Sequence, residues 1–168
     1  MMSRRNFLGG TAVAAALAAA GLTLRGKGAS ADDAASPAFE ITRSDAEWRS
    51  QLTPAQYRVL RSHGTERPGT SPLNGEKRRG TYHCAGCDLP LFSSETKYES
   101  GTGWPSFYAP LENAIATSED RSFFTVRTEV HCRRCGGHQG HVFEDGPKPT
   151  GLRYCINGVA LSFVAAEA

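Results

Sequence analysis

Residues 151–158, with the sequence G-L-R-Y-C-I-N-G, form the segment from which we interpret the rest of the chain. If they form a strand, alternation places Arg153, Cys155 and Asn157 on one face, above an apolar opposite face. A cation and an amide beside a thiol favour the thiolate and can hold a polar ligand. A structural cysteine in a buried strand is the alternative, and this segment alone leaves both interpretations open.

The length and charge of the chain limit its class. Its 168 residues are enough for one domain with a real core. The formal net charge of +2 provides no basic footprint, so we expect no nucleic-acid partner. Glycine and proline are frequent and helical periodicity is scarce after residue 64, which favours a mainly β body.

The N-terminus is interpreted as an export signal. Residues 3–8, S-R-R-N-F-L, carry the twin-arginine pattern, and a moderately hydrophobic run follows at residues 8–24. Small residues at 29–31 predict cleavage after Ala31. An ordinary secretory signal or an uncleaved anchor is the alternative.

Three parts of the chain follow from this signal: residues 1–31 are a twin-arginine signal peptide, residues 32–41 a linker and residues 42–168 the domain. We expect no stable membrane anchor after cleavage, since no other run has transmembrane length. The mature domain would function in the periplasm or another oxidising, extracytoplasmic compartment.

Two short helices are predicted before the β body. Residues 44–47, S-D-A-E, and residues 53–56, T-P-A-Q, both fit a capping box, and Gly64 is expected to end the second helix. Their apolar stripes are expected to pack onto the body. The run at residues 66–80, rich in proline, glycine and charge, predicts a surface loop.

Strands are expected at residues 89–92, at residues 123–130 and from Cys155 to Val164. In the second of these, Phe124, Val126 and Val130 are expected on one face. Alternatively, Asn157 and the following glycine form a hairpin turn, which would take Asn157 out of the strand. Residues 100–107, S-G-T-G-W-P-S-F, predict a rigid turned loop that presents an indole as a core plug or a pocket wall.

Four of the five cysteines form two C-x-x-C knuckles, Cys84 with Cys87 and Cys132 with Cys135. Two such knuckles supply the four thiolates of a tetrahedral zinc site, which we favour over two disulfides or a redox C-x-x-C. The knuckles are far apart in the chain, so one structural zinc ion would connect two distant hairpins.

A zinc site leaves Cys155 without a partner. A lone cysteine with histidines elsewhere in the chain is a candidate nucleophile. His138 and His141 follow the second knuckle closely, which fixes their position. With Arg153 and Asn157, they are candidates for a proton donor and orienting groups.

These motifs together resemble the B-type methionine sulfoxide reductases, which reduce the R epimer of methionine sulfoxide. The resemblance covers about residues 42–164 and is carried by the paired knuckles, S-G-x-G-W-P-S-F at 100–107, G-H-x-G-H-V-F at 137–143 and R-Y-C-I-N at 153–157. It implies two small antiparallel sheets in a tent-like, zinc-stapled arrangement, with the N-terminal helices packed outside.

The resemblance also implies roles for individual residues. It implies that Cys155 is the nucleophile and that Trp104 contacts the S-methyl group of the substrate. The sulfoxide oxygen must be protonated before it can leave, and His141 is our first choice as the acid. The remaining expectations are Phe107 as a second substrate-binding residue, Asp145 as a support, the four knuckle cysteines as zinc ligands, and His138, Arg153 and Asn157 on the polar side.

One position departs from a common family pattern. Many members carry a resolving cysteine two residues before the pocket tryptophan, where this chain has Thr102. We therefore predict that Cys155 becomes a sulfenic acid that an external thiol resolves, with an exported thioredoxin-like protein as reductant.

We expect oxidised proteins as the main substrate and a monomeric enzyme. We have no functional interpretation of Glu144. An inactive zinc-stapled binding module and a C-x-x-C oxidoreductase are the alternative functions.

Overall fold

The computed structural model describes residues 39–122 and 125–167. The predicted signal peptide and most of the predicted linker lie outside these residues. Within them, no helix has the length and apolar character needed to cross a membrane.

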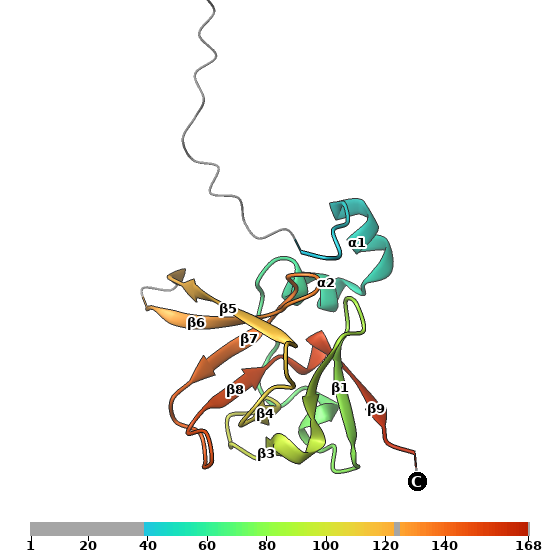
Figure 1. Cartoon of the computed structure of the whole chain (residues 1–168). Coiled ribbons are helices and arrows are strands. Elements are labelled where there is room, and N and C mark those ends of the chain that lie inside the picture. Colours follow the sequence, from blue (N-terminus) through green and yellow to red (C-terminus); the bar gives the residue numbers. More distant parts are fainter. Residues whose placement is uncertain (1–38, 123–124, 168) are drawn as a thin grey trace, which may run out of the picture. The chain divides into compact units, whose positions relative to one another are not determined.

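The two predicted helices are confirmed as α1 (Asp45–Gln51) and α2 (Pro54–Leu60). Both capping boxes are present, because each helix begins with a side chain that accepts from the N3 backbone N–H. Figure 1 shows both helices outside the sheets. The predicted end of α2 was wrong: the helix ends at Leu60, and His63, with φ 52°, takes the left-handed conformation.

All described strands belong to two antiparallel sheets, which confirms the mainly β fold (Figure 1). The smaller sheet has the order β2-β1-β9 and the larger has the order β3-β4-β8-β7-β6-β5. The strands are β1 (Gly80–Cys84), β2 (Pro90–Ser93), β3 (Lys97–Tyr98), β4 (Ser106–Phe107), β5 (Ile115–Asp120), β6 (Arg127–Cys132), β7 (His138–Phe143), β8 (Arg153–Ile156) and β9 (Leu161–Ala165). The described residues also include the 3-10 helices η1 (Pro72–Asn74), η2 (Ser94–Thr96) and η4 (Gly158–Ala160).

An aromatic cluster joins the two sheets. Phe107 of β4 stacks on Phe92 of β2, with ring centroids 4.4 Å apart, and meets the edge of Tyr82 of β1 at 5.0 Å. All three side chains are fully buried. The prediction that Phe107 binds substrate is therefore corrected: its ring fills the core, where removal of a phenyl side chain costs about 3–5 kcal/mol.

Two strand predictions also change. The strand expected at 123–130 begins only at Arg127; Val130 is buried as expected, whereas Val126 is 66% exposed and Phe124 lies outside the described residues. The chain does turn after Asn157, so Asn157 lies outside β8, as the turn alternative predicted. The turn does not form a hairpin, because η4 follows it and β9 belongs to the smaller sheet.

The register of the larger sheet aligns six polar side chains in one row. Cys155 pairs with Ser106 on one side and His141 on the other, and His141 pairs with Glu129. Direct cross-strand partners point to the same face, so the row continues to both edges. Its members, in order, are Tyr98, Ser106, Cys155, His141, Glu129 and Ser118.

A bulge between β6 and β7 adds one histidine to this face. The register shifts between Val130 and His131, so that His131 pairs with His138. Residues three apart on a regular strand point to opposite faces, and the extra residue removes that difference. The His138 and His141 rings therefore lie 5.4 Å apart in an edge-to-face contact.

Gly140 is required by the close approach of β7 to β8. A Cβ atom at this position would lie 2.0 Å from the Cys155 carbonyl oxygen. We expect Gly140→Ala to destabilise the protein by about 3 kcal/mol, because the two backbones must separate. Urea unfolding measures this, with Gly75→Ala, whose Cβ meets only Pro72 O at 3.9 Å, as the control expected within about 0.5 kcal/mol. Equal losses in both variants would contradict the expectation.

Candidate functional site

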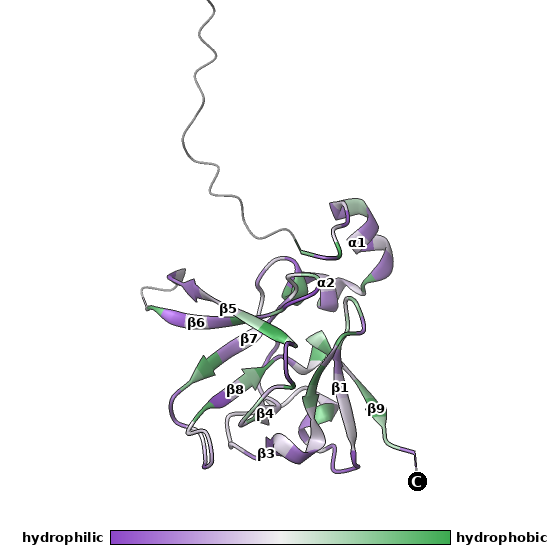
Figure 2. Ribbon diagram, in the orientation of Figure 1, coloured by the Kyte–Doolittle hydropathy of each residue, from purple (hydrophilic) through white to green (hydrophobic). Residues whose placement is uncertain are grey.

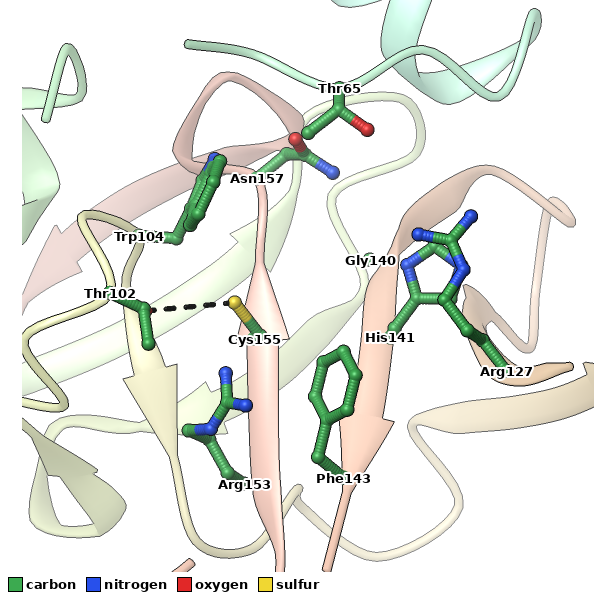
Figure 3. A pocket seen from close by; sticks show the side chains of 10 residues that line it. All are labelled: Thr65, Thr102, Trp104, Arg127, Gly140, His141, Phe143, Arg153, Cys155 and Asn157. Carbon is green, nitrogen blue, oxygen red and sulfur yellow. Dashed lines mark hydrogen bonds between the residues drawn. The ribbon is translucent and has the colours of Figure 1, made fainter. Parts of the chain in front are cut away.

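A cavity of about 300 Å³ opens above the polar row. Figure 3 shows Cys155 of β8 between two walls, with Thr102 and Trp104 on one side and His141 and Arg127 on the other. The remaining lining residues are Thr65, Gly140, Phe143, Arg153 and Asn157. This volume is at the lower end of the range for small-ligand pockets and suits a single side chain.

The structure brings together five of the residues selected from the sequence: Trp104, His141, Arg153, Cys155 and Asn157 all line this cavity. The others lie elsewhere. Phe107 is in the core, His138 is buried behind the pocket and Asp145 pairs with Arg153.

Trp104 is a pocket wall and not a core plug. Its loop turns at Gly101 and Gly103, which have φ of 73° and 92° and so need glycine. The indole Nε1 donates to the Glu66 carbonyl oxygen at 3.2 Å. Since the N–H is used there, the indole contributes mainly apolar surface to the cavity.

The amide of Asn157 is held in one orientation. Its Oδ1 accepts from the Glu66 backbone N–H at 3.0 Å, and its Nδ2 donates to the Gln139 carbonyl at 2.9 Å. The second Nδ2 hydrogen has no acceptor among the described residues. Asn157 can therefore present a hydrogen-bond donor, and not an acceptor, to a ligand in the cavity.

Glu66 contacts both Trp104 and Asn157, and sequence reasoning did not identify it. The carboxylate is buried and accepts from the backbone N–H groups of Gly158 and Val159, the second at 3.1 Å. Sequence reasoning assigned Glu66 to a surface loop because an isolated glutamate among proline and glycine has no diagnostic spacing. In the fold, it is the point where Trp104 and Asn157 are both fixed.

His141 is oriented by an acidic partner that sequence reasoning also missed. His141 Nε2 lies 2.7 Å from Asp120 Oδ2, which also accepts from Arg127 at 2.7 Å. Figure 2 shows β5 changing from hydrophobic to hydrophilic along its length, and Asp120 ends that strand. Hydrogen bonds from Ser122 and His141 hold the pKa of Asp120 well below its usual value. Burial lowers the pKa of His141, against the opposing effect of Asp120, so neutral imidazole is favoured.

His138 is 2% exposed, and its Nδ1 lies 2.7 Å from Glu129 Oε1. Ser118 also donates to Glu129, at 2.6 Å. Because the His138 ring contacts His141, this buried pair supports the wall of the pocket from behind.

The charge beside Cys155 is already paired. Arg153 donates two hydrogen bonds of 2.8 Å to Asp145 and stacks on the Phe143 ring. Burial raises the pKa of the Cys155 thiol, although the Thr102 hydroxyl, 3.9 Å from Sγ, and the Arg153 guanidinium act in the opposite direction. The sequence-based expectation that Arg153 and Asn157 favour thiolate is corrected: in the free protein, burial outweighs these polar neighbours.

The four knuckle cysteines meet where the two sheets adjoin. Cys84 ends β1 of the smaller sheet and Cys132 ends β6 of the larger. The Sγ atoms of all four lie within 4.8 Å of one another, with Cys84–Cys135 at 3.8 Å and Cys87–Cys132 at 3.5 Å. A disulfide needs about 2.05 Å, and tetrahedral zinc at 2.3 Å places its sulfurs about 3.8 Å apart. The cluster can hold a metal ion, and the donor set fits zinc.

Two known sequence patterns match the chain. Residues 52–165 match the SelR domain, and residues 1–21 match the twin-arginine translocation pathway signal sequence. The second match supports the predicted export of the protein.

Curated relatives cover the same region. The protein named peptide methionine sulfoxide reductase MsrB from Pseudomonas putida (strain W619) is 59% identical over 125 residues, which is 74% of this chain and 94% of the relative. The proteins of that name from Agrobacterium fabrum and Methanosarcina mazei are 54% and 56% identical; the alignments cover 74% and 76% of this chain, and 93% and 92% of those proteins.

We expect Glu66→Ala to cost about 3 kcal/mol in the free energy of unfolding, because two backbone N–H groups lose their acceptor. Glu66→Gln should cost less, since one acceptor oxygen remains. Denaturant unfolding followed by tryptophan fluorescence measures both. Exposed Glu112→Ala is the control, expected within about 0.5 kcal/mol. A Glu66→Ala protein as stable as this control would show that the two contacts contribute nothing.

We also expect the alkylation rate of Cys155 to rise with pH around a midpoint above the ordinary thiol value of about 8.5, because its pKa is raised. Arg153→Met should move the midpoint higher still, whereas Arg153→Lys should keep it closer to wild type. Iodoacetamide labelling followed by mass spectrometry reads out the rate at this cysteine. A midpoint lower than that of the urea-unfolded chain is the contrary outcome.

Proposed function

The chain belongs to the SelR-domain family, the MsrB-type peptide methionine sulfoxide reductases, and from this premise we propose that Cys155 reduces methionine-R-sulfoxide in oxidised proteins through a one-cysteine cycle. One observation carries the proposal: a lone thiol lies in a cavity that is also lined by an indole and an oriented amide donor. The indole suits the methyl group of a methyl sulfoxide, and the amide donor suits its oxygen.

The indole of Trp104 suits the apolar S-methyl group, because sulfur-bearing groups are attracted to aromatic rings. The free Nδ2 hydrogen of Asn157 suits the sulfoxide oxygen, which can only accept. A substrate held this way would present its sulfur to Cys155 between the two contacts. Oxidised residues in proteins, with backbone on either side, would reach the cavity through its open mouth.

The protonation states support a proton relay. Cys155 starts as a thiol and His141, its cross-strand partner, starts as neutral imidazole. We propose that His141 accepts the thiol proton as sulfur attacks sulfur and then delivers it to the sulfoxide oxygen. The S–S bond forms as the S–O bond breaks, and the protonated oxygen leaves as hydroxide. Hydroxide then attacks Cys155 Sγ, the S–S bond breaks, and methionine leaves with Cys155 as a sulfenic acid. The substrate sulfur gains the two electrons that the cysteine sulfur loses, so atoms and electrons balance. His141 thus becomes an acid only after acting as a base.

Asp120 supports this role. Its carboxylate at His141 Nε2 stabilises the imidazolium formed in the relay and leaves Nδ1 for the moving proton. Arg153 and its partner Asp145 complete the polar side of the pocket. His138 acts from behind, through its contact with His141.

Resolution is proposed to need an external thiol. Thr102 occupies the position at which many family members carry a resolving cysteine. Its hydroxyl lies 3.9 Å from Cys155 Sγ and cannot form a disulfide. An incoming thiol condenses with the sulfenic acid to give a mixed disulfide and water, and a second thiol frees Cys155. With an export signal on the chain, we propose an exported thioredoxin-like dithiol as the donor.

We propose zinc as the metal of the four-cysteine cluster. Cys84, Cys87, Cys132 and Cys135 would hold one ion where the sheets adjoin, and bound zinc supplies folding free energy and no redox chemistry. The nearby Cys135–Gly136–Gly137 turn leads directly into His138, so the cluster would also fix the start of β7.

A single turnover without reductant tests the one-cysteine cycle. We expect wild type to release one equivalent of methionine from the R epimer and to gain one oxygen at Cys155. Thr102→Cys should instead lose two hydrogens as it forms a disulfide with Cys155, because the side chains are in contact. Intact-mass spectrometry with a sulfenic-acid trap distinguishes the two products.

Cys155→Ser is the matched control and should release no methionine while remaining folded. Methionine release by this variant would end the proposal. A disulfide in the wild-type protein after substrate would retain the activity but reject the one-cysteine cycle.

Cys87→Ser should lose the metal and most of the folded population, since metal binding energy is folding energy at such sites, about 10–16 kcal/mol for small zinc domains. Elemental analysis and circular dichroism measure this. Cys155→Ser, which removes a cysteine outside the cluster, should keep one zinc per chain. Full metal content in the Cys87→Ser protein would exclude the four-cysteine site.

A further inference from the structure

A second group of metal-binding side chains lies behind the pocket. Glu129 is in contact with three imidazoles, and we refer to Glu129, His63 and His138 as the Glu129 cluster. His138 Nδ1 and His63 Nδ1 lie 2.7 and 3.0 Å from the same oxygen, Glu129 Oε1. His131 Nδ1 lies 3.8 Å from the other carboxylate oxygen.

We propose that the Glu129 cluster binds a divalent transition-metal ion, independently of the four cysteines. Its two imidazole nitrogens and one carboxylate oxygen all lie within 4.8 Å of one another. Two histidines and a carboxylate are a common ligand set for zinc and for other borderline metals. With both imidazoles neutral, as metal ligation requires, the set carries one negative charge, which favours a cation over an anion.

The geometry needs only a small adjustment. Ligand atoms about 2.0–2.1 Å from a tetrahedral metal are about 3.3 Å apart, slightly more than the hydrogen-bond distances in the cluster. A metal would replace the protons that now lie between these atoms. His63 can make the adjustment, because its side chain is 66% exposed and it lies in the loop after α2.

The Glu129 cluster has two buried ligands and one ligand that solvent can reach. Glu129 is 8% exposed and His138 is 2% exposed, so two ligands are held firmly. His63 closes the site from the solvent side and leaves open coordination positions for water. Alternatively, the two histidines only form hydrogen bonds with Glu129 and offset its charge. This interpretation predicts that the cluster binds no metal.

Metal binding here would affect the pocket. The His138 ring contacts His141, and Glu129 is the cross-strand partner of His141. An ion held by His138 and Glu129 would change the orientation and charge behind His141, which moves the proton in the proposed reaction. We therefore infer reversible inhibition of reductase activity by the ion. The inhibition rests on the proposed function, whereas the binding does not.

Cobalt(II) titration tests the binding directly. The full protein is used with zinc in its cysteine cluster and with Cys155 alkylated, so that no free thiol competes. We expect one additional cobalt per chain, with weak visible bands typical of nitrogen and oxygen ligands. Thiolate-to-metal charge-transfer bands, or no additional cobalt, would overturn the proposal.

His63→Asn is the informative variant. Asparagine tolerates the positive φ of this position but cannot replace the imidazole at the carboxylate. Affinity should fall by more than the ~10–100-fold typical of losing an outer hydrogen-bond partner. Glu95→Gln, which removes an exposed carboxylate elsewhere, should bind cobalt as wild type does. Unchanged affinity in His63→Asn would reject the cluster as the site.

Activity assays with unmodified Cys155 separate the two parts of the inference. Wild-type activity should fall when zinc is added and return with a chelator, whereas His63→Asn should retain its own activity at the same zinc concentration. Equal inhibition of both proteins would place the inhibitory ion elsewhere, for example on Cys155. Cobalt binding at the cluster without inhibition would reject the coupling to the pocket and leave the binding site standing.

Discussion

The pairing of β7 with β8 is the constraint on which the pocket depends. This ladder places His141 opposite Cys155, and Gly140 allows the two backbones to approach. A slip of one residue would send Cys155 to the core face and Tyr154 or Ile156 to the pocket. The bulge between β6 and β7 then adds His138 to the same face. The positions of Cys155 and both histidines therefore follow from backbone hydrogen bonds before any side-chain contact is counted.

The second level of organisation lies between the sheets. The aromatic cluster of Tyr82, Phe92 and Phe107 fills the interior, and the four cysteines meet at one edge of it. Glu66 plays a comparable part on the pocket side, where it ties the loop before the sheets to the start of η4. Glu66 thus supports the pocket, whereas the four cysteines, which could hold a metal ion, lie where the two sheets adjoin.

The features that could be predicted from the sequence are those with a short motif at fixed spacing. The capping boxes at Ser44 and Thr53, the two C-x-x-C knuckles and the loop around Trp104 were readable because their chemistry depends on fixed spacing. Glu66 and Asp120 were missed because their roles arise from contacts over long stretches of chain. Phe107 was assigned to substrate because it follows Trp104 in a motif, although β4 turns its ring into the core. The pKa of Cys155 could not be read either, since it depends on burial more than on neighbouring residue types.

The contact between Glu66 and Asn157 has a consequence for folding. These residues are 91 positions apart, so they meet only after almost the whole domain has closed. Contacts of such long range form late, once the entropy of loop closure has been overcome by the rest of the fold. In a partly folded chain, Trp104 lacks its acceptor, Asn157 can rotate and Cys155 is an ordinary solvated thiol. A chain that folds before translocation, as the twin-arginine route allows, completes the pocket while the surroundings still keep thiols reduced. Because this contact forms late, Cys155 becomes sheltered only when the domain is nearly complete, and folding before export would place that step ahead of translocation.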